Sequence, residues 1–211
     1  MQQPQFFQKT FQHGGVGSMY HYYMFYKPAG CITARRDAKH ATVMDYFVEL
    51  HNENLSPVGR LDLETEGLLF ITDDGMWNQQ LTHPDYKKEK CYEFWVTGEI
   101  TEDGKQQLEQ GLWIEGFEEI TAPAKVILTE RSCLKEVLPD LPAVLQKKYS
   151  VRQPNYPVVK GKITITEGKK RQIRRMMKAI GCRVIYLKRI SMGEYVLDET
   201  LKPGEWKEFF P

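Results

Sequence analysis

The chain lacks the long apolar runs of membrane-spanning proteins. Within its 211 residues, no stretch approaches the roughly 18 consecutive apolar residues that a membrane helix needs. The first residues are rich in glutamine and lack the basic-then-apolar pattern of a secretory signal. These absences argue against a membrane or secreted protein and predict one that is soluble and cytoplasmic.

Cysteine is scarce, and no metal-binding spacing is present. The 4 cysteines stand far apart without a Cys-x-x-Cys pair, and the 5 histidines include no His-Glu-x-x-His motif. This pattern argues against a zinc ribbon or finger, a disulfide scaffold and a zinc protease of that type. We expect Cys31, Cys91, Cys133 and Cys182 to be reduced and mostly buried.

The composition is that of a globular chain. Apolar residues make up 41% and charged residues 27%, which argues against a disordered protein. The length allows one large domain or two small ones and suffices for a core without disulfide or metal support. Residues 1–18 are polar and Gly-punctuated, so we expect a disordered leader or an expression remnant there, before a single domain over 19–211.

The formal net charge of +1 conceals a strong division of charge along the chain. Residues 147–189 hold 14 Lys or Arg residues and a single acidic residue, Glu167, which gives +13. The remaining residues hold 15 basic and 27 acidic side chains, a net −12. This division indicates a polyanionic partner for one face of the molecule; the alternative is a solvated basic face without a partner.

Hydrophobic patterning predicts an α+β fold with a mixed or mainly antiparallel sheet. Expected strands cover residues 21–26, 67–72, 91–97, 125–129, 162–166, 184–187 and 206–210. Expected helices cover 43–50, 102–110 and 170–180, with Thr42 and Thr101 as caps of the first two. We expect a tight turn at Asp73-Asp74-Gly75 and an irregular loop or hinge over the proline-containing segment 131–157.

The helix expected over 170–180 has two distinct faces. Ile173, Met176, Met177 and Ile180 follow helical spacing and form an apolar stripe. Basic residues of the same spacing lie opposite this stripe: Arg171, Arg174, Arg175 and Lys178.

The segment GRLDLETEG (residues 59–67) has closely spaced carboxylates before an expected buried strand. Asp62, Glu64 and Glu66 imitate the ligand spacing of a calcium loop. That reading is disfavoured, because a calcium loop of this kind has a helix on each side and Pro57 breaks the preceding one.

A second interpretation makes Arg60 and Asp62 an active pair. Residues two apart on an extended chain point the same way, and nearby positive charge keeps a carboxylate ionised. Such a carboxylate can act as a nucleophile or a base. From spacing alone, an aspartate that caps a turn beside a surface arginine is the commoner arrangement.

Six motifs in this sequence resemble those of one known family. GRLDLETEGLLFITDDG resembles the signature of the RsuA/RluB/RluE/RluF family of pseudouridine synthases. The family motifs KPxG, LTHP, EKxY, EGxxRQIRRM and LxRxxxG are matched in order by residues 27–30, 81–84, 89–92, 167–176 and 187–193. The resemblance covers about residues 24–209.

The resemblance implies a fold and a branch of the family. The implied fold is a mixed, mainly antiparallel sheet in two halves, with the active cleft across the middle. Only about 20 residues precede the catalytic motifs, too few for the S4 RNA-binding domain that most members carry. The chain therefore looks most like the RluE-type branch without S4, whose substrate is large-subunit (23S) ribosomal RNA.

The resemblance also implies a mechanism without cofactor or metal. These enzymes break the N1–C1′ bond of a uridine in RNA, turn the uracil and rejoin it through C5. By position, Asp62 matches the catalytic aspartate, which attacks C1′ in one mechanism and abstracts a 2′ proton in another. Tyr92 matches the tyrosine that stacks on uracil and helps to remove the C5 proton. Arg174 matches the arginine that pairs with the aspartate.

Further residues are implied to bind the RNA. Arg60 matches an arginine that occupies the gap left by the flipped base. Leu187 matches an apolar residue of the uracil pocket; that it is simply a core leucine is an equally good interpretation. Phosphate contact is expected for Lys27, Lys169, Lys170, Arg171, Arg175 and Lys178. His83 is expected to be a turn residue. The expected partner is ribosomal RNA, bound by a monomer. The main alternative is a non-catalytic RNA-binding ribosome-assembly factor on the same fold.

Overall fold

The computed structural model of the protein describes residues 20–211. The leader expected at residues 1–18 lies outside the described residues. The strands are β1 (Tyr22–Lys27), β2 (Ser56–Val58), β3 (Glu66–Thr72), β4 (Lys90–Thr97), β5 (Lys125–Cys133), β6 (Pro157–Ile165), β7 (Arg183–Met192), β8 (Tyr195–Val196) and β9 (Trp206–Glu208). The α-helices are α1 (Gly75–Thr82), α2 (Glu102–Gln110), α3 (Leu134–Val137), α4 (Ala143–Tyr149) and α5 (Gln172–Ala179). Short 3-10 helices are η1 (Val43–Leu50), η2 (Pro84–Tyr86) and η3 (Leu138–Asp140).

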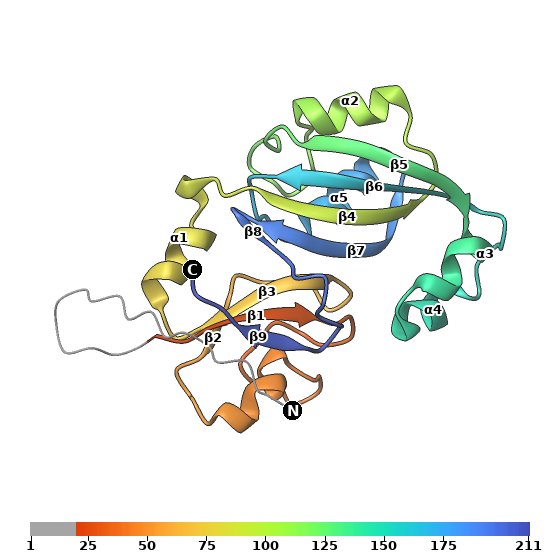
Figure 1. Ribbon diagram of the computed structural model, residues 1–211. Coiled ribbons are helices and arrows are strands. Elements are labelled where there is room, and N and C mark those ends of the chain that lie inside the picture. Colours follow the sequence, from red (N-terminus) through yellow and green to blue (C-terminus); the bar gives the residue numbers. More distant parts are fainter. Residues whose placement is uncertain (1–19) are drawn as a thin grey trace.

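One sheet runs through the molecule in the order β5-β6-β4-β7-β3-β1-β9, with β2 beside β3 and β8 beside β7. Figure 1 shows it as two groups of strands. We call β5, β6, β4 and β7 the large half-sheet and β3, β1 and β9 the small half-sheet. Neighbouring strands within each half are antiparallel. The predicted α+β class and the two-part, mainly antiparallel sheet are confirmed.

The two halves meet through a short parallel pairing of β3 with β7. Its register joins Glu66 to Lys188 and Gly67 to Arg189. Gly67 has a φ of 102°, and a Cβ added there would lie 2.2 Å from the backbone oxygen of Arg189. Only glycine allows this conformation and this close approach. The junction therefore requires the glycine at the start of the GLLFIT strand.

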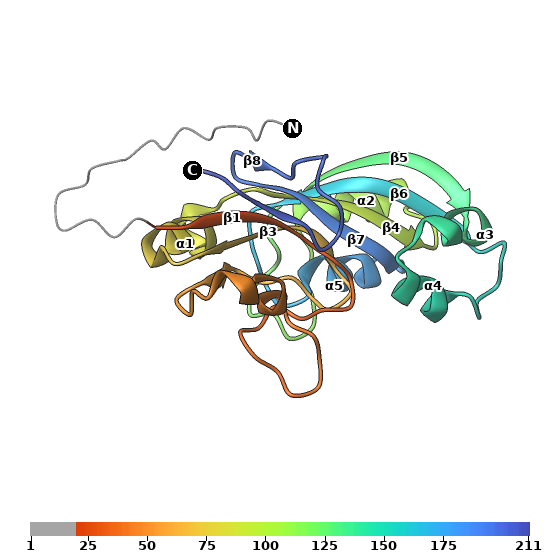
Figure 2. The same ribbon diagram turned by 60° about the horizontal axis from the view of Figure 1, so that its bottom comes forward.

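The largest core lies between the sheet and the elements on one of its faces. Figure 2 shows α5 and the 3-10 helix η1 on the same side of the sheet. Val43 and Phe47 of η1, and Ile173 and Met177 of α5, are buried in this core. A fully buried side chain of this size contributes about 1.5–3 kcal/mol. Burial of these apolar faces fixes both elements on the sheet.

Helix α5 has the expected apolar stripe but begins two residues later than predicted. Ile173, Met176 and Met177 are buried, and the partly buried Ile180 packs against the same core. Arg171, at the N-cap, has a left-handed φ of 54°, so the helix cannot extend back through it. The phosphate-facing residues expected before Gln172 therefore belong to a loop.

The segment 131–157, expected to be irregular, is mostly ordered secondary structure. Strand β5 continues to Cys133, and α3, η3 and α4 follow before β6 begins. Leu134, Leu145 and Tyr149 are buried in a separate small core with Trp95 and Tyr186 of the large half-sheet. Short helices between prolines leave little periodicity in a sequence, and tertiary burial supplies their stability instead.

Two other local predictions need correction. Asp73-Asp74-Gly75 is not a hairpin turn, because the Asp74 side chain accepts hydrogen bonds from Met76 N and Trp77 N at 2.9 and 3.0 Å and begins α1. The helix expected from Val43 is present as the 3-10 helix η1, capped by Thr42 as predicted. The cap predicted for α2, Thr101, is confirmed, and Gly111 follows the last residue of the helix.

The four cysteines are free, with Cys31 and Cys182 buried and Cys91 and Cys133 half-buried. From residue 20 onward, no helix combines the length and apolar character that crossing a membrane requires.

Candidate active site

A cavity of about 290 Å³ opens beside the junction of the two half-sheets. Its walls come from the loop between β2 and β3, from β4 and β7, and from the start of α5. We call this cavity the cleft. Its size is at the lower end of the range of small-ligand sites, about 300–1,000 Å³. The predicted site residues that line it are Arg60, Asp62, Tyr92, Lys169, Arg171, Arg174 and Leu187.

Hydrogen bonds from Thr33 and within the 59–65 loop fix the position of Asp62. The Thr33 hydroxyl donates to the carbonyl oxygen of Leu61 at 2.8 Å and accepts from the Leu61 N–H at 3.1 Å. After Asp62, the N–H of Thr65 donates to the Asp62 carbonyl oxygen at 3.0 Å. The loop is therefore held on both sides of Asp62, whose side chain remains 39% exposed toward the cleft.

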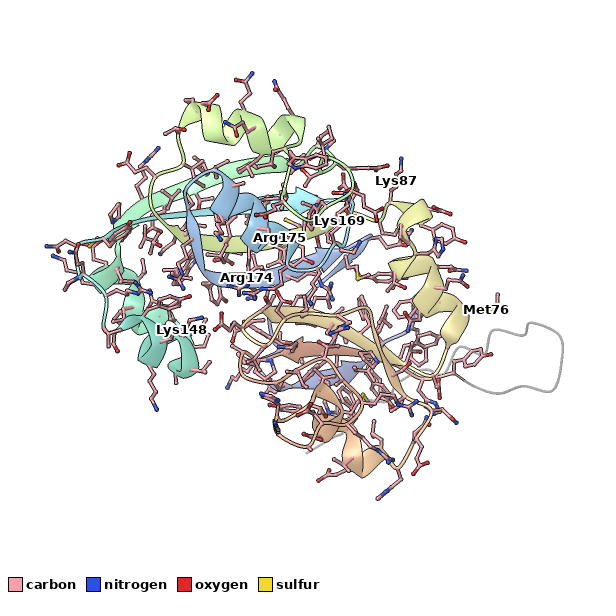
Figure 3. The ribbon with its side chains drawn as sticks, turned by 180° about the vertical axis from the view of Figure 1, so that it is seen from behind. Met76, Lys87, Lys148, Lys169, Arg174 and Arg175 are labelled. Atoms are coloured by element: carbon pink, nitrogen blue, oxygen red, sulfur yellow. The ribbon has the colours of Figure 1, made fainter. Side chains whose placement is uncertain are left out.

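Arg174 reaches the loop from α5 and lies between two carboxylates. Its Nε is 3.7 Å from Asp62 Oδ2, and its Nη1 is 3.6 Å from Glu64 Oε2. Viewed from behind, Arg174 lies between α5 and the small half-sheet, with Lys148 on α4 to the side (Figure 3). Unlike the outer basic residues of α5, Arg174 has a side chain that is only 10% exposed.

Burial and nearby carboxylates have opposite effects on the pKa of Arg174. Burial lowers the pKa of its guanidinium, and the negative charges of Glu64 and Asp62 counteract this. Nη1 also donates to the carbonyl oxygen of Val184 at 3.4 Å. Within the described part of the chain, Arg174 Nη2 is buried without a hydrogen-bond partner. A buried donor left unpaired is costly, so this atom is available to a group that enters the cleft.

Side chains of β4 and β7 form the floor of the cleft. Tyr92 is paired in register with Arg189, and Leu187 lies two residues before Arg189 on the same face of β7. Tyr92 and Leu187 are both buried in the main core and line the cleft. Tyr92 and Leu187 can therefore be core residues and also contact a ligand, because this part of the core borders the cavity.

Two basic residues of the floor were not predicted as site residues. Arg189 is buried and its Nε donates to the Leu68 carbonyl oxygen at 2.8 Å, which ties β7 to β3. Burial lowers the pKa of Lys90, and the positive charge of Arg189 adds to this effect. The alternation of side chains along a strand could have pointed to them. Lys90 stands two residues from Tyr92, and Arg189 stands two residues from Leu187, so each shares a strand face with a predicted site residue.

The phosphate contact predicted for Lys27 is wrong in this structure. The Lys27 side chain is fully buried, and its ammonium donates to the carbonyl oxygens of Pro28 and Thr65 at 2.9 and 2.8 Å. Burial lowers its pKa to about 8, although Cys31, Glu66 and Asp62 favour the charged form. Lys27 therefore binds the end of the Asp62 loop to the turn after β1.

The remaining predicted RNA contacts differ in their surroundings. Arg60 and Arg171 are exposed at the cleft, and Lys170 and Lys178 are exposed outside its lining. Lys169 lines the cleft and forms an ion pair with Glu167 at 3.1 Å.

Arg175 is engaged within the protein. Its guanidinium carbon lies 4.3 Å from the centre of the Phe117 ring and a nitrogen donates to the Glu115 carbonyl oxygen. This arrangement indicates that Arg175 holds the 111–121 loop in place, rather than contacting phosphate.

The acidic residues of the calcium-like pattern have different partners. Asp62 faces Arg174, Glu64 binds Lys148, and Glu66 accepts from the Tyr186 hydroxyl at 3.1 Å. No group of three or more His, Cys, Asp or Glu side chains within residues 20–211 is arranged to hold a metal ion. His83 begins η2 as a capping residue, which confirms its prediction as a turn residue.

Comparison with known proteins identifies relatives along most of the chain. Residues 21–179 match the family model described as RNA pseudouridylate synthase. The chain is 35% identical over 186 residues to ribosomal small subunit pseudouridine synthase A of Vibrio cholerae serotype O1, covering 88% of this chain and 69% of the relative. It is 35% identical over 189 residues to the uncharacterized RNA pseudouridine synthase YtzG of Bacillus subtilis, covering 89% and 69%.

Solved structures agree with these relatives. A crystal structure of a pseudouridylate synthase matches with a TM-score of 0.73 at 29% identity, covering 91% of this chain and 71% of that one. Human RNA pseudouridylate synthase domain containing 1 matches with a TM-score of 0.55 at 13% identity, covering 92% and 86%, and shows the shared fold. With the family match, the fold and the named relatives in agreement, the chain belongs to the RNA pseudouridylate synthase family and is a pseudouridine synthase.

Proposed function

We propose that this enzyme converts a uridine of ribosomal RNA to pseudouridine, with Asp62 as its nucleophile. The observation that carries the proposal is the meeting of Asp62, Arg174 and Tyr92 in one cavity, although each comes from a different segment of the chain. The names of relatives such as the Vibrio cholerae ribosomal small subunit pseudouridine synthase support ribosomal RNA as the substrate.

Asp62 acts on the sugar of the bound uridine. Its carboxylate is oriented by the loop hydrogen bonds around it and faces the guanidinium of Arg174. The positive charge of Arg174 attracts the carboxylate and helps to hold it in a fixed orientation at the cleft. Both attack at C1′ and abstraction of a 2′ proton are compatible with this geometry.

Tyr92 and Leu187 form the surface on which the uracil lies. Their side chains come from neighbouring strands and share one face of the large half-sheet. The uridine has to leave its stack to reach them, at a cost of a few kcal/mol. Arg60 is exposed at the cleft, where its planar guanidinium can stack in the gap that the flipped base leaves.

Basic residues around the opening bind the RNA backbone. Arg171 and Lys169 line the cleft. Lys170, in the loop before α5, and Lys178, on α5, are exposed outside this lining and add positive charge near it. Contacts of this kind position the strand without reading its sequence and make binding depend on salt.

The subunit that contains the target is a finer part of the proposal. The RluE-type branch, which is expected from the sequence, would act on the large-subunit RNA. Relatives from Vibrio cholerae and Haemophilus influenzae are named small-subunit synthases. We keep the large subunit as the sequence-based prediction, and direct comparison of the two RNAs decides it.

Tritium release from [5-³H]uridine-labelled transcripts tests the proposal, because isomerisation frees the C5 hydrogen. Large-subunit and small-subunit transcripts are assayed separately, with RNA binding measured in parallel. Release from the large-subunit transcript supports both parts of the proposal, and release from the small-subunit transcript alone overturns the branch prediction. The enzyme is also given each RNA within an assembling ribosomal subunit. If both RNAs bind but neither the free transcripts nor the assembling subunits release tritium, the non-catalytic assembly factor is favoured.

A further inference from the structure

Four charged side chains form a continuous series from α4 to the cleft. Lys148 of α4 binds Glu64 Oε1, and the other oxygen of Glu64 lies 3.6 Å from Arg174 Nη1. Arg174 Nε in turn lies 3.7 Å from Asp62. The series thus connects the small helical segment α3–α4 with the aspartate of the cleft.

Arg174 is shared almost evenly between its two carboxylates. The distances of 3.6 Å to Glu64 and 3.7 Å to Asp62 both exceed the usual hydrogen-bond range of about 2.7–3.2 Å. Glu64 is no weaker a competitor than Asp62, because carboxylates pair with arginine in a bidentate way when nothing else holds them. Some other group must therefore limit the pull of Glu64 on the guanidinium.

Lys148 is the group in position to do so. Burial opposes ionisation of Glu64, but its hydrogen bond and charge interaction with Lys148, with smaller effects of Arg174 and Arg171, hold the pKa of Glu64 below its usual range. Glu64 is therefore charged, and a cation in contact with it weakens its field at Arg174. The same contact engages Glu64 Oε1, so that only Oε2 is within ion-pair distance of Arg174.

We propose that Lys148 is a positioning residue, which restrains Glu64 so that Arg174 remains directed at Asp62. The inference rests on the proposed function, since it gives the pairing of Arg174 with Asp62 a catalytic purpose. Without Lys148, Glu64 takes Arg174 as its own partner and the aspartate loses part of its orientation.

Two substitutions and their combination test this role. Lys148→Met is expected to lower kcat about tenfold with little change in KM, since a displaced orienting group slows the reaction more than it weakens binding. Glu64→Gln alone supplies the reference kcat in the absence of the competing charge. The double variant Lys148→Met/Glu64→Gln is expected to recover the kcat of Glu64→Gln, because the competing charge is gone. Lys147→Met, a change of the neighbouring exposed lysine on α4, is the matched control.

A spectroscopic readout follows Arg174 without relying on activity. The ¹⁵N–¹H signal of Arg174 Nε is identified by its loss in Arg174→Lys. It is expected to shift in Lys148→Met and to return toward the wild-type position in the double variant. If Asp62→Asn proves fully active, the proposed function fails while this signal still reports whether Lys148 controls Arg174.

Three results would overturn the inference. The first is a double variant as slow as Lys148→Met, which would mean that α4 only holds the loop in place. The second is a change confined to KM and to the salt dependence of RNA binding, which would make Lys148 a phosphate contact. The third is an Arg174 signal that does not respond to Lys148→Met.

Discussion

Among single residues, Lys27 has the least expected environment. Its ammonium is fully buried between the turn after β1 and the end of the Asp62 loop, where it donates to two backbone carbonyl oxygens. A methionine of similar length fills the space but leaves those carbonyl oxygens without their donor. Lys27 therefore links the stability of the protein to the position of the loop.

Lys27 predicts an alkaline dependence of stability. Burial lowers its pKa to about 8 in the folded chain, from 10.5 in the unfolded one, so the unfolded state binds more protons between these values. The free energy of unfolding therefore rises with pH across this window, by an amount on the order of 3 kcal/mol for this group.

Urea unfolding at about pH 7 and about pH 10 compares wild type with Lys27→Met. Wild type should gain stability relative to the variant as the pH rises, since the other alkaline groups are common to both proteins. A stability difference that is the same at the two pH values would contradict this account.

The motif residues are distant in the sequence but meet in the fold. Asp62, Tyr92, Arg174 and Leu187 were singled out by resemblance, and the fold brings them to one cavity. The phosphate contact predicted for Lys27 was wrong. A lysine beside a proline-glycine turn is usually exposed, but the burial of Lys27 depends on the distant 59–65 loop. Contacts across such sequence separations leave no local pattern.

At the scale of elements, Asp74 caps the N-terminus of α1 and also connects it to β1. Besides the two N–H groups of α1, Asp74 accepts a hydrogen bond from the Tyr22 hydroxyl at 2.7 Å. Asp74→Ala should cost about 1–2 kcal/mol and lower Tm by a few degrees. Asp74→Asn should lose less, because asparagine also caps helices.

Thermal melts and tritium release together test this prediction. Thr82, at the other end of α1, lines the cleft, but Asp74 does not, so kcat of Asp74→Ala should equal that of wild type below its melting range. A loss of kcat without a loss of Tm would mean that α1 has a catalytic role.

Elements with strong local signals were predicted and those with weak ones were not. The all-buried strand β3, the capped helix α2 and the apolar stripe of α5 follow from spacing and capping alone. Helices α3 and α4 were not predicted, because they have 4 and 7 residues and stand among prolines. The parallel pairing of β3 with β7 is a tertiary feature that periodicity does not encode.

At the scale of the whole molecule, part of the basic segment 147–189 lines the cleft: Lys169, Arg171, Arg174 and Arg189. Arg171 is exposed at the cleft with a left-handed backbone, which asparagine tolerates. Arg171→Asn should therefore weaken RNA binding and reduce the slope of log Kd against log salt by about 0.7 to 1. Lys39→Gln, at an exposed position outside the cleft lining, is the control. An unchanged slope for Arg171→Asn would remove Arg171 from the phosphate contacts.

The central claim is that the cleft performs isomerisation through Asp62. The most direct measurement is tritium release by Asp62→Asn beside wild type, with RNA affinity measured for both. Asp85→Asn, at an aspartate whose side chain is 87% exposed, is the matched control. We predict that Asp62→Asn keeps nearly all of its RNA affinity and loses turnover, while Asp85→Asn behaves as wild type. Turnover retained by Asp62→Asn would contradict the account.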